Sequence, residues 1–479
     1  MKAPKLYAAI RIVSCWIAAF LPGNLWAATY FPIATNGAIV EFAGPVFYDG
    51  TNYLTGIISG TNVSVQRFSS NGGLLGSLLN VGANAGFPPA VALAAGQTNY
   101  LVAWSDYSLS SGVTMFGQFV TRGGAKFGSA FHLLQSQGSH GFQAVKGLAS
   151  DGTNYLAVWQ DKNDDHFYGQ LITASGTLSG SEFLISGQQQ NGDSAVVAFG
   201  KTNYLVGWQS SNDEEGDMNK TFGAIVSRSG TAGGWFQISQ AISPSQNPLA
   251  VGFDGTNYLV VWNHDIGPGF PSPTDWDIHG RLVSQVGTLP GNELTLVNDA
   301  GSQVLPSLAF DGSSYLLAWG DSPFETTNST IRFRFFDRSA SPVGPDFTLF
   351  ANQGTNAPLF TLNSVAFDGA RLVAAAMLGT IQTDLDGSVT NIPSGDVYGV
   401  FISSSTAPAQ LDVTGPLTGA QFPLLLTGTP GINYIIQTKT NLASINWGSL
   451  VTNSPTNGAF TFSDTHATNT SRFYRAVKQ

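Results

Sequence analysis

The chain has 479 residues, yet it contains one cysteine, Cys15, and only 10% of its residues are charged. Because Cys15 lies near the N-terminus in a segment expected to be removed, the remaining chain has no thiol for disulfides, cysteine metal sites or nucleophilic catalysis. Lys and Arg number 20 against 30 Asp and Glu, which gives a formal net charge of −10. Nucleic acids and anionic membrane surfaces are bound through clustered basic residues, so we expect neither as a partner.

Beyond residue 30 the sequence has no run of 18 apolar residues, which is about the length needed to span a membrane as a helix. At the N-terminus, an apolar stretch at 12–21 follows the basic residues Lys2, Lys5 and Arg11, and a cleavage-site pattern ends at Ala27. This predicts a signal peptide at 1–27 and a secreted protein, extracellular or at the cell surface. An alternative is a lipoprotein signal that ends at Cys15.

The chain does contain one phrase that returns seven times, with its clearest copy, Asp-Gly-Thr-Asn-Tyr-Leu-Val-Val-Trp, at 254–262. The copies begin at Asp49, Gly96, Asp151, Gly200, Asp254, Asp311 and Asp368. A period near 50 residues with strand-like content is typical of β-propellers and β-arrays. With 56 glycines and many turn residues, the composition predicts an all-β fold.

Each repeat contains four short apolar segments, which in the clearest copy lie at 248–253, 258–262, 278–283 and 293–297. Four strands per repeat make one propeller blade. Asp254-Gly255 predicts a tight turn between the first two strands, since glycine readily adopts positive φ. Tyr258 and Trp262 share one face of the second strand, where we expect them to pack against a neighbouring blade. A glycine recurs in the third strand and predicts close backbone approach.

The seventh repeat lacks a fourth strand before residue 403, whereas a segment resembling a fourth strand, Phe31-Pro32-Ile33-Ala34, precedes the first repeat. We therefore predict that the N-terminal strand completes the last blade and closes a seven-bladed β-propeller at 28–402. Closure removes exposed sheet edges without disulfides. Six or eight blades, or an open array, are the alternatives.

These repeats resemble the Tyr-Leu-Val-Val-Trp repeats of many exported bacterial proteins, which form seven-bladed propellers distantly similar to the integrin α-subunit head. The resemblance implies an architecture and no particular activity. The first and last repeats depart from it, because Ile57 and Ala376 replace the tryptophan and Leu372 replaces the tyrosine.

A different pattern begins after a linker at 403–410, with short apolar segments about ten residues apart through 411–479. This predicts a small C-terminal β-sandwich. Its final phrase, Arg472-Phe473-Tyr474-Arg475-Ala476-Val477, resembles a module that ends many exported proteins of environmental bacteria, which implies a role in attachment, sorting or carbohydrate contact. We expect Arg472 and Arg475 to pair with Asp464.

Acidic residues gather between the second and third strands of the repeats, and 16 of the 30 lie there. We expect them to make one face of the propeller negative, which favours cations and cationic or polyhydroxylated partners. The candidate ligand-binding residues are Asp106, Asp164, Asp213, Asp265, Asp277 and Asp321.

Calcium is the one cofactor that the sequence suggests. Asp161, Asn163 and Asp165 alternate like the first oxygen donors of a calcium loop. The match is incomplete, since His166 replaces the turn glycine and Ile172 stands where a bidentate Glu is required. Solvated acidic loops are the alternative.

No catalytic motif of a serine hydrolase, zinc peptidase or sialidase occurs in the sequence. His166, His264 and His279 lie near the acidic loops, and we expect them to be solvated. The leading hypothesis is an exported, non-enzymatic binding or scaffold protein, expected to be monomeric, that presents the acidic face to a glycan, protein or cation.

Two alternatives stay open: a carbohydrate-active enzyme, either glycoside hydrolase or lyase, that uses paired carboxylates, and a structural cell-surface component. Burial discriminates between enzyme and binding surface. An enzyme should bring buried carboxyl groups together in a pocket, whereas a binding surface should leave them exposed.

Overall fold

The computed structural model describes residues 27–34, 41–83, 91–106, 114–134, 143–161, 163–187, 194–212, 218–240, 249–266, 275–322, 330–351, 359–368, 371–383, 389–403, 410–413, 421–427, 433–440, 447–453, 459–465 and 473–478. These residues form strands and turns, and none of them is helical. Accordingly, the described segments include no helix with the length and hydrophobicity of a membrane span. Apart from Ala27, the predicted signal peptide lies outside these ranges.

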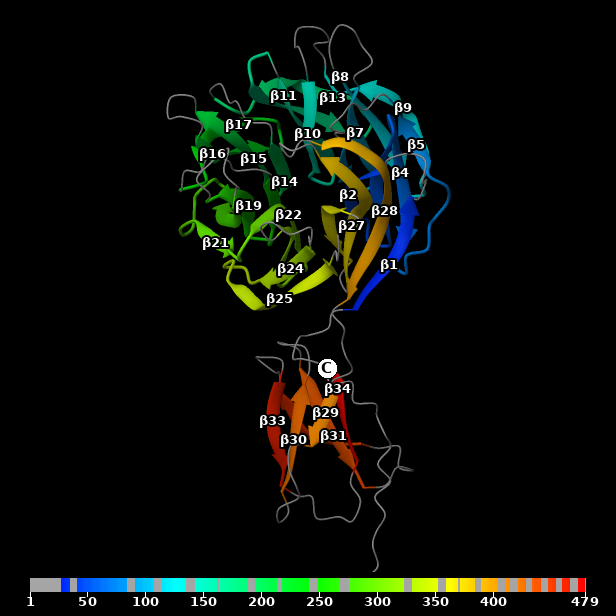
Figure 1. Ribbon diagram of the computed structural model, residues 1–479. Helices are drawn as coiled ribbons and strands as arrows, with labels where there is room; N and C mark the ends of the chain where they lie inside the picture. The colour runs from blue at the N-terminus through cyan, green and yellow to red at the C-terminus, as the bar shows by residue number, and fades with distance from the viewer. Residues whose placement is uncertain are drawn as a thin grey trace, which may run out of the picture.

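Seven four-stranded antiparallel sheets, called blades 1 to 7, are arranged in a ring (Figure 1). Blade 1 contains β2 (Glu41–Tyr48), β3 (Asn52–Ser59), β4 (Asn62–Ser69) and β5 (Leu79–Gly82). Blade 2 contains β6 (Val91–Ala95), β7 (Asn99–Asp106), β8 (Thr114–Thr121) and β9 (Lys126–His132). Blade 3 contains β10 (Gln143–Ser150), β11 (Asn154–Asp161), β12 (His166–Thr173) and β13 (Leu178–Leu184).

The other blades repeat this order. Blade 4 contains β14 (Ala195–Phe199), β15 (Asn203–Asn212), β16 (Met218–Ser227) and β17 (Ala232–Gln237). Blade 5 contains β18 (Leu249–Phe253), β19 (Asn257–Asp265), β20 (Trp276–Ser284) and β21 (Leu294–Val297). Blade 6 contains β22 (Ser302–Phe310), β23 (Tyr315–Ser322), β24 (Thr330–Phe336) and β25 (Pro342–Ala351). Blade 7 contains β26 (Leu359–Phe367), β27 (Leu372–Thr383), β28 (Val389–Ser403) and β1 (Ala27–Ala34).

The N-terminal strand closes the ring, as the sequence predicted. β1 pairs antiparallel with β28, and Phe31 lies opposite Gly399. A Cβ atom on Gly399 would lie only 2.1 Å from Cζ of Phe31. Gly169 of blade 3 makes room for Phe183 of its own fourth strand in the same way. Phe31 therefore takes the place of a fourth-strand aromatic, and the third-strand glycine exists because that ring must approach the backbone closely.

The core consists of seven hydrophobic clusters of described residues, one between each pair of adjacent blades. In a typical cluster, Tyr258 and Trp262 of blade 5 pack with Leu205 and Ile238 of blade 4. Tyr258 and Trp262 are both fully buried. The repeated aromatic residues are therefore packing residues, as predicted, and burial of such large side chains stabilises each blade interface.

The repeated Asp-Gly pair forms the predicted turn. Asp254 Oδ1 accepts hydrogen bonds from the backbone nitrogens of Thr256 at 2.7 Å and Asn257 at 2.6 Å. Gly255 has φ of 92°, a conformation that glycine tolerates and most residues do not. Tyr315 of the next blade donates to the Asn257 carbonyl at 3.2 Å. The turn of one blade thus holds the tyrosine of the following blade.

The C-terminal strands form two three-stranded sheets, one ordered β29-β30-β33 and the other β32-β31-β34. Their bounds are β29 (Gln410–Val413), β30 (Phe422–Thr427), β31 (Tyr434–Lys439), β32 (Gly448–Asn453), β33 (Ala459–Asp464) and β34 (Phe473–Lys478). Leu426 of one sheet packs with Tyr434 and Ile436 of the other, so the pair is a sandwich.

The predicted pairing of Arg475 with Asp464 is wrong. Tyr474 donates to Asp464 Oδ2 at 2.9 Å, whereas Arg475 donates to Gln437 Oε1 at 2.9 Å. Residues alternate faces along a strand, so Tyr474 and Arg475 point to opposite sides. Arg472 lies outside the described residues.

Candidate functional site

The second strands end and the third strands begin at one edge of the propeller, which we call the acidic edge. Its candidate residues include Asp106 at the end of β7, Asp265 at the end of β19, Asp277 near the start of β20 and Asp321 near the end of β23. Their exposed fractions are 8%, 4%, 7% and 7%, so all four are buried. Asp164 is partly exposed, and Asp213 lies outside the described residues. Among the candidates that the structure describes, these four are thus buried, whereas Asp164 keeps partial contact with solvent.

In blade 3, the predicted calcium residues form a turn. Asp161 Oδ1 accepts a hydrogen bond from the Asn163 nitrogen at 2.9 Å. Asp165 has φ of 55°. These contacts give Asp161 and Asp165 roles in the backbone turn, and calcium binding by Asp161, Asn163 and Asp165 stays a prediction.

Asp164 of the same turn accepts hydrogen bonds from the His166 nitrogen at 3.0 Å and from the Tyr168 hydroxyl at 2.7 Å. Burial alone would raise the pKa of Asp164, but these hydrogen bonds outweigh it and hold the pKa below the usual value. Asp164 is therefore an ionised, structural residue of this turn at neutral pH.

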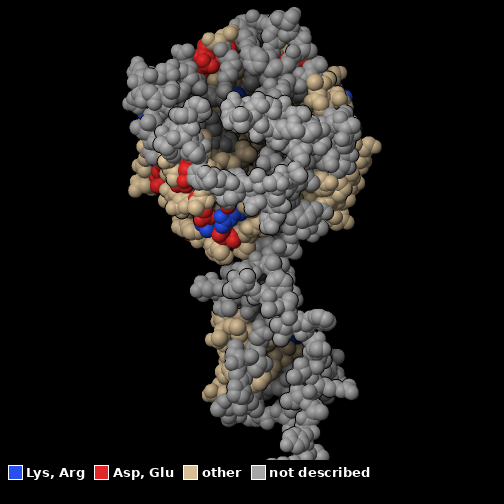
Figure 2. Space-filling model, viewed as in Figure 1, with Lys and Arg blue, Asp and Glu red and all other residues tan. Residues whose placement is uncertain are grey.

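In blade 6, an arginine neutralises the candidate Asp321. Arg332 Nη1 lies 3.0 Å from Asp321 Oδ2 and 2.6 Å from Asp299 Oδ2. Its Nη2 pairs with Asp346, which also accepts a hydrogen bond from Arg334 at 3.2 Å. Figure 2 shows basic and acidic atoms meeting over β24 and β25. Arg332 lies on the third strand of the blade and reaches the acidic edge from there.

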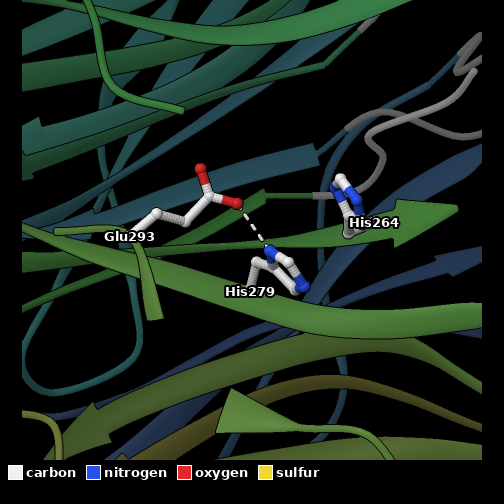
Figure 3. A group of neighbouring side chains, drawn as sticks. All are labelled: His264, His279 and Glu293. Atoms are coloured by element: carbon white, nitrogen blue, oxygen red, sulfur yellow. Dashed lines mark hydrogen bonds and ion pairs between the residues drawn. The ribbon is translucent and has the colours of Figure 1, made fainter. Parts of the chain in front are cut away.

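In blade 5, two histidines and a glutamate lie together (Figure 3). His264 and His279 are stacked, with ring centroids 4.1 Å apart and ring planes 12° apart. His279 Nδ1 lies 2.5 Å from Glu293 Oε1. His264 is only 7% exposed. The prediction that His264 and His279 are solvated is therefore wrong, because the strands carry both side chains into the space between blades.

His264 is held as a neutral imidazole. Burial, reinforced by the neighbouring His279, lowers the pKa of His264 to about 4, although Glu293 opposes the shift. Its Nδ1 is buried and has no hydrogen-bond partner. A buried polar atom without a partner is costly, and native proteins generally avoid it.

Glu293 is fixed by the preceding blade. The Gln240 backbone nitrogen donates to Glu293 Oε2, and the Glu293 nitrogen donates to Gln240 Oε1 at 2.9 Å. On the other side of His279, Thr295 Oγ1 lies 3.3 Å from Nε2. The cluster therefore sits at the boundary of blades 4 and 5, and contacts from two blades orient its side chains.

Strand pairing separates the other acidic candidates of blade 5. Asp277 lies opposite His264, and His279 lies opposite Trp262, so these four side chains share the face toward blade 4. Asp265 lies on the opposite face. Burial raises the pKa of Asp277 above its ordinary value, although His279 partly opposes that effect.

The repeat itself shows what is unusual about blade 5. The third-strand residue opposite the tryptophan is aromatic in blades 2, 3 and 4, where it is Phe116, Tyr168 and Phe222. In blade 5 it is His279, and in blade 6 it is Arg332. An acid follows 14 residues later in both, as Glu293 and Asp346. Aligning the repeats would have revealed both departures.

No protein-family model matches the chain, and no curated protein matches it closely enough to be a relative. Among solved structures, it is similar to the GH93 alpha-L-arabinofuranosidase of Fusarium graminearum, with 11% identity, a TM-score of 0.42, and coverage of 67% of this chain and 95% of that one. A subtype N10 neuraminidase-like protein of A/little yellow-shouldered bat/Guatemala is 9% identical, with a TM-score of 0.40 and coverage of 79% and 98%.

A prolyl endopeptidase is 12% identical, with a TM-score of 0.43 and coverage of 82% of this chain. The chain spans 54% of the length of that peptidase. These values are too low to transfer an activity, a substrate or a residue role to this chain.

Proposed function

We propose that this protein is an exported, carbohydrate-active enzyme whose carboxyl groups at the acidic edge cleave a glycan. The burial of Asp106, Asp265, Asp277 and Asp321 carries this proposal. An exposed binding surface has no need to bury its carboxylates. Buried carboxyl groups at a loop-bearing edge are typical of catalytic sites.

Glycosidic-bond cleavage suits the residues available. It needs a carboxyl group that donates a proton and a second carboxylate that acts as base or nucleophile, with no thiol or serine motif. Asp277 is the candidate proton donor, because it is buried beside His279 and opposite His264 in the strand pairing. The predicted signal peptide supports an extracellular place of action.

The second candidate function is non-enzymatic glycan or protein binding. It is favoured by the structural use of the carboxylates in the neighbouring blades: Asp164 bonds within its own turn, and Asp321 pairs with Arg332. Groups engaged in this way form a fixed surface rather than a reactive one.

One experiment tests both functions. The purified chain is incubated with a panel of soluble polysaccharides, and new reducing or unsaturated ends are measured together with retardation in polysaccharide-containing gels. We expect product formation that Asp277→Asn abolishes and the control Asp164→Asn retains. Retardation without product would establish the binding protein instead, and neither signal on any polysaccharide would contradict both proposals.

A further inference from the structure

We propose that His264, His279 and Glu293 form a binding site for one divalent transition-metal ion, with zinc the best match. One ligand atom from each of the three side chains lies within 4.8 Å of the others. Figure 3 shows the Glu293 carboxylate directed at His279, with the His264 ring beside that of His279. The site adjoins Asp277, which lies opposite His264, but it includes none of the carboxyl groups proposed to cleave glycans, and its test needs no substrate.

The buried nitrogen of His264 points to a missing partner. His264 is 93% buried, by its exposed fraction of 7%, and its Nδ1 makes no hydrogen bond. Trp262, two residues earlier on the same face of the strand, packs between blades 4 and 5, so the strand directs this imidazole toward blade 4. A metal ion would supply the partner that the protein does not, since neutral imidazole nitrogen is a common metal ligand.

Blade 6 shows what occupies the same position when the sequence supplies a cation. There, Arg332 stands where His279 stands, and Asp346 stands where Glu293 stands. The guanidinium lies between Asp321 and Asp299 and also pairs with Asp346. Blade 5 keeps the acid but replaces the permanent cation by an imidazole, so an external cation can take the place of the guanidinium.

The ligand types select the metal. Two imidazole nitrogens and one carboxylate oxygen form a donor set used for zinc, with a fourth position open to water. Calcium prefers six or more oxygen ligands and is a poor match. For His279 Nδ1 and Glu293 Oε1 both to bind the ion, the hydrogen bond between them would have to break, because a ligand atom must offer a free lone pair.

Glu293 is already oriented for this role. The Gln240 nitrogen donates to Glu293 Oε2, which fixes the carboxylate and leaves Oε1 directed at His279. Such contacts behind a ligand raise metal affinity because they reduce the freedom lost on binding.

The test is metal binding by the purified full chain, with affinity tags removed and metal stripped by chelator. Isothermal titration with zinc should give one equivalent per chain, and cobalt should give visible absorption bands of a four-coordinate site. His264→Asn and Glu293→Gln should each weaken binding at least about tenfold, since even outer contacts contribute that much. Circular dichroism and urea unfolding establish that each variant is folded.

The matched control is His132→Asn, which removes another partly buried histidine of blade 2 that also has an unpartnered Nδ1. It should bind zinc like the parent. Absence of a one-to-one zinc complex, or equal affinity of the parent and both folded site variants, would overturn the proposal. If the parent chain binds zinc but forms no product from any polysaccharide, only the proposed enzymatic function is overturned.

Discussion

Blades 5 and 6 are neighbours in the ring and share one framework, but they treat the acidic edge differently. Both bury a tyrosine and a tryptophan of the second strand completely. At the position opposite the tryptophan, blade 6 carries Arg332 and blade 5 carries His279. The arginine pairs with three carboxylates, whereas the histidine is bonded to Glu293 and stacks on a second, neutral histidine. In blade 6 a cationic side chain neutralises the carboxylates, and in blade 5 no permanently charged cation stands at that position.

Because blades 5 and 6 share one framework, its buried tryptophan should contribute equally to the free energy of unfolding in both. Trp262→Ala and Trp319→Ala should each destabilise the protein by about 3–5 kcal/mol, because each removes a fully buried indole from a blade interface. Urea unfolding followed by tryptophan fluorescence and circular dichroism measures the loss. A large difference between the two variants would show that the blades are not equivalent.

The ion-pair cluster of blade 6 should be costly to break. Arg332→Met is expected to destabilise the protein by about 3 kcal/mol, since it leaves Asp299, Asp321 and Asp346 without their shared cation. The control is Arg338→Met, which removes an exposed hydrogen bond to the Gly312 carbonyl and should cost less than about 1 kcal/mol. Equal midpoints of urea unfolding for the two variants would contradict the difference.

Blade 5 can be converted to resemble blade 6. In His279→Arg, the guanidinium should pair with Glu293, so the unfolding midpoint should no longer respond to zinc. The parent should gain about 2.7 kcal/mol at a zinc concentration one hundred times its Kd, because the ion binds only the folded state. Thermal unfolding with zinc and with chelator measures this. A zinc response retained by the variant would exclude His279 as a ligand.

The smallest expected effect concerns the turns between the third and fourth strands. In blade 6, Asp337 Oδ1 accepts hydrogen bonds from the nitrogens of Ser339 and Ser341, and in blade 5 Ser284 Oγ accepts from Thr288. Burial alone would raise the pKa of Asp337, but hydrogen bonds from Ser339 and Ser341 lower it below its ordinary value.

A lowered pKa stabilises the fold above the pKa of the unfolded chain, near 4, and this contribution is lost as the pH falls through the folded value. Asp337→Ser should therefore reduce, slightly, the stability lost between neutral pH and acid. Urea unfolding at a series of pH values measures it. An acid response identical to that of the parent would show that this carboxylate does not contribute.

The fold could be predicted because its local causes lie within the repeated phrase. Asp254 and Gly255 determine a turn by short-range hydrogen bonding and backbone freedom, and the third-strand glycine signals a close approach whatever its neighbour is. An extra fourth-strand segment, Phe31-Pro32-Ile33, precedes the first repeat, and the seventh repeat lacks a fourth strand. Together these two features predicted closure of the ring. Each of these signals depends on spacing of a few residues.

The site could not be predicted in the same way. Asp265 and Asp277 looked alike in the sequence, but strand alternation places them on opposite faces. The partner of His279 comes from 14 residues further along, and the backbone nitrogen that donates to the Glu293 carboxylate belongs to Gln240, which follows the last strand of blade 4. The many acidic residues of the loops suggested one negative surface, but Arg332, which lies on a strand, neutralises part of that surface.

The sequence by itself determined the all-β class, the seven blades and the closure by the first strand, because repetition imposes the same local geometry on every unit. Only the tertiary structure decided which of the residues that differ from the repeat pattern come into contact. Burial between blades turned His264 into a neutral imidazole beside His279, because stacking of neighbouring sheets removes water and brings residues from separate strands within bonding distance.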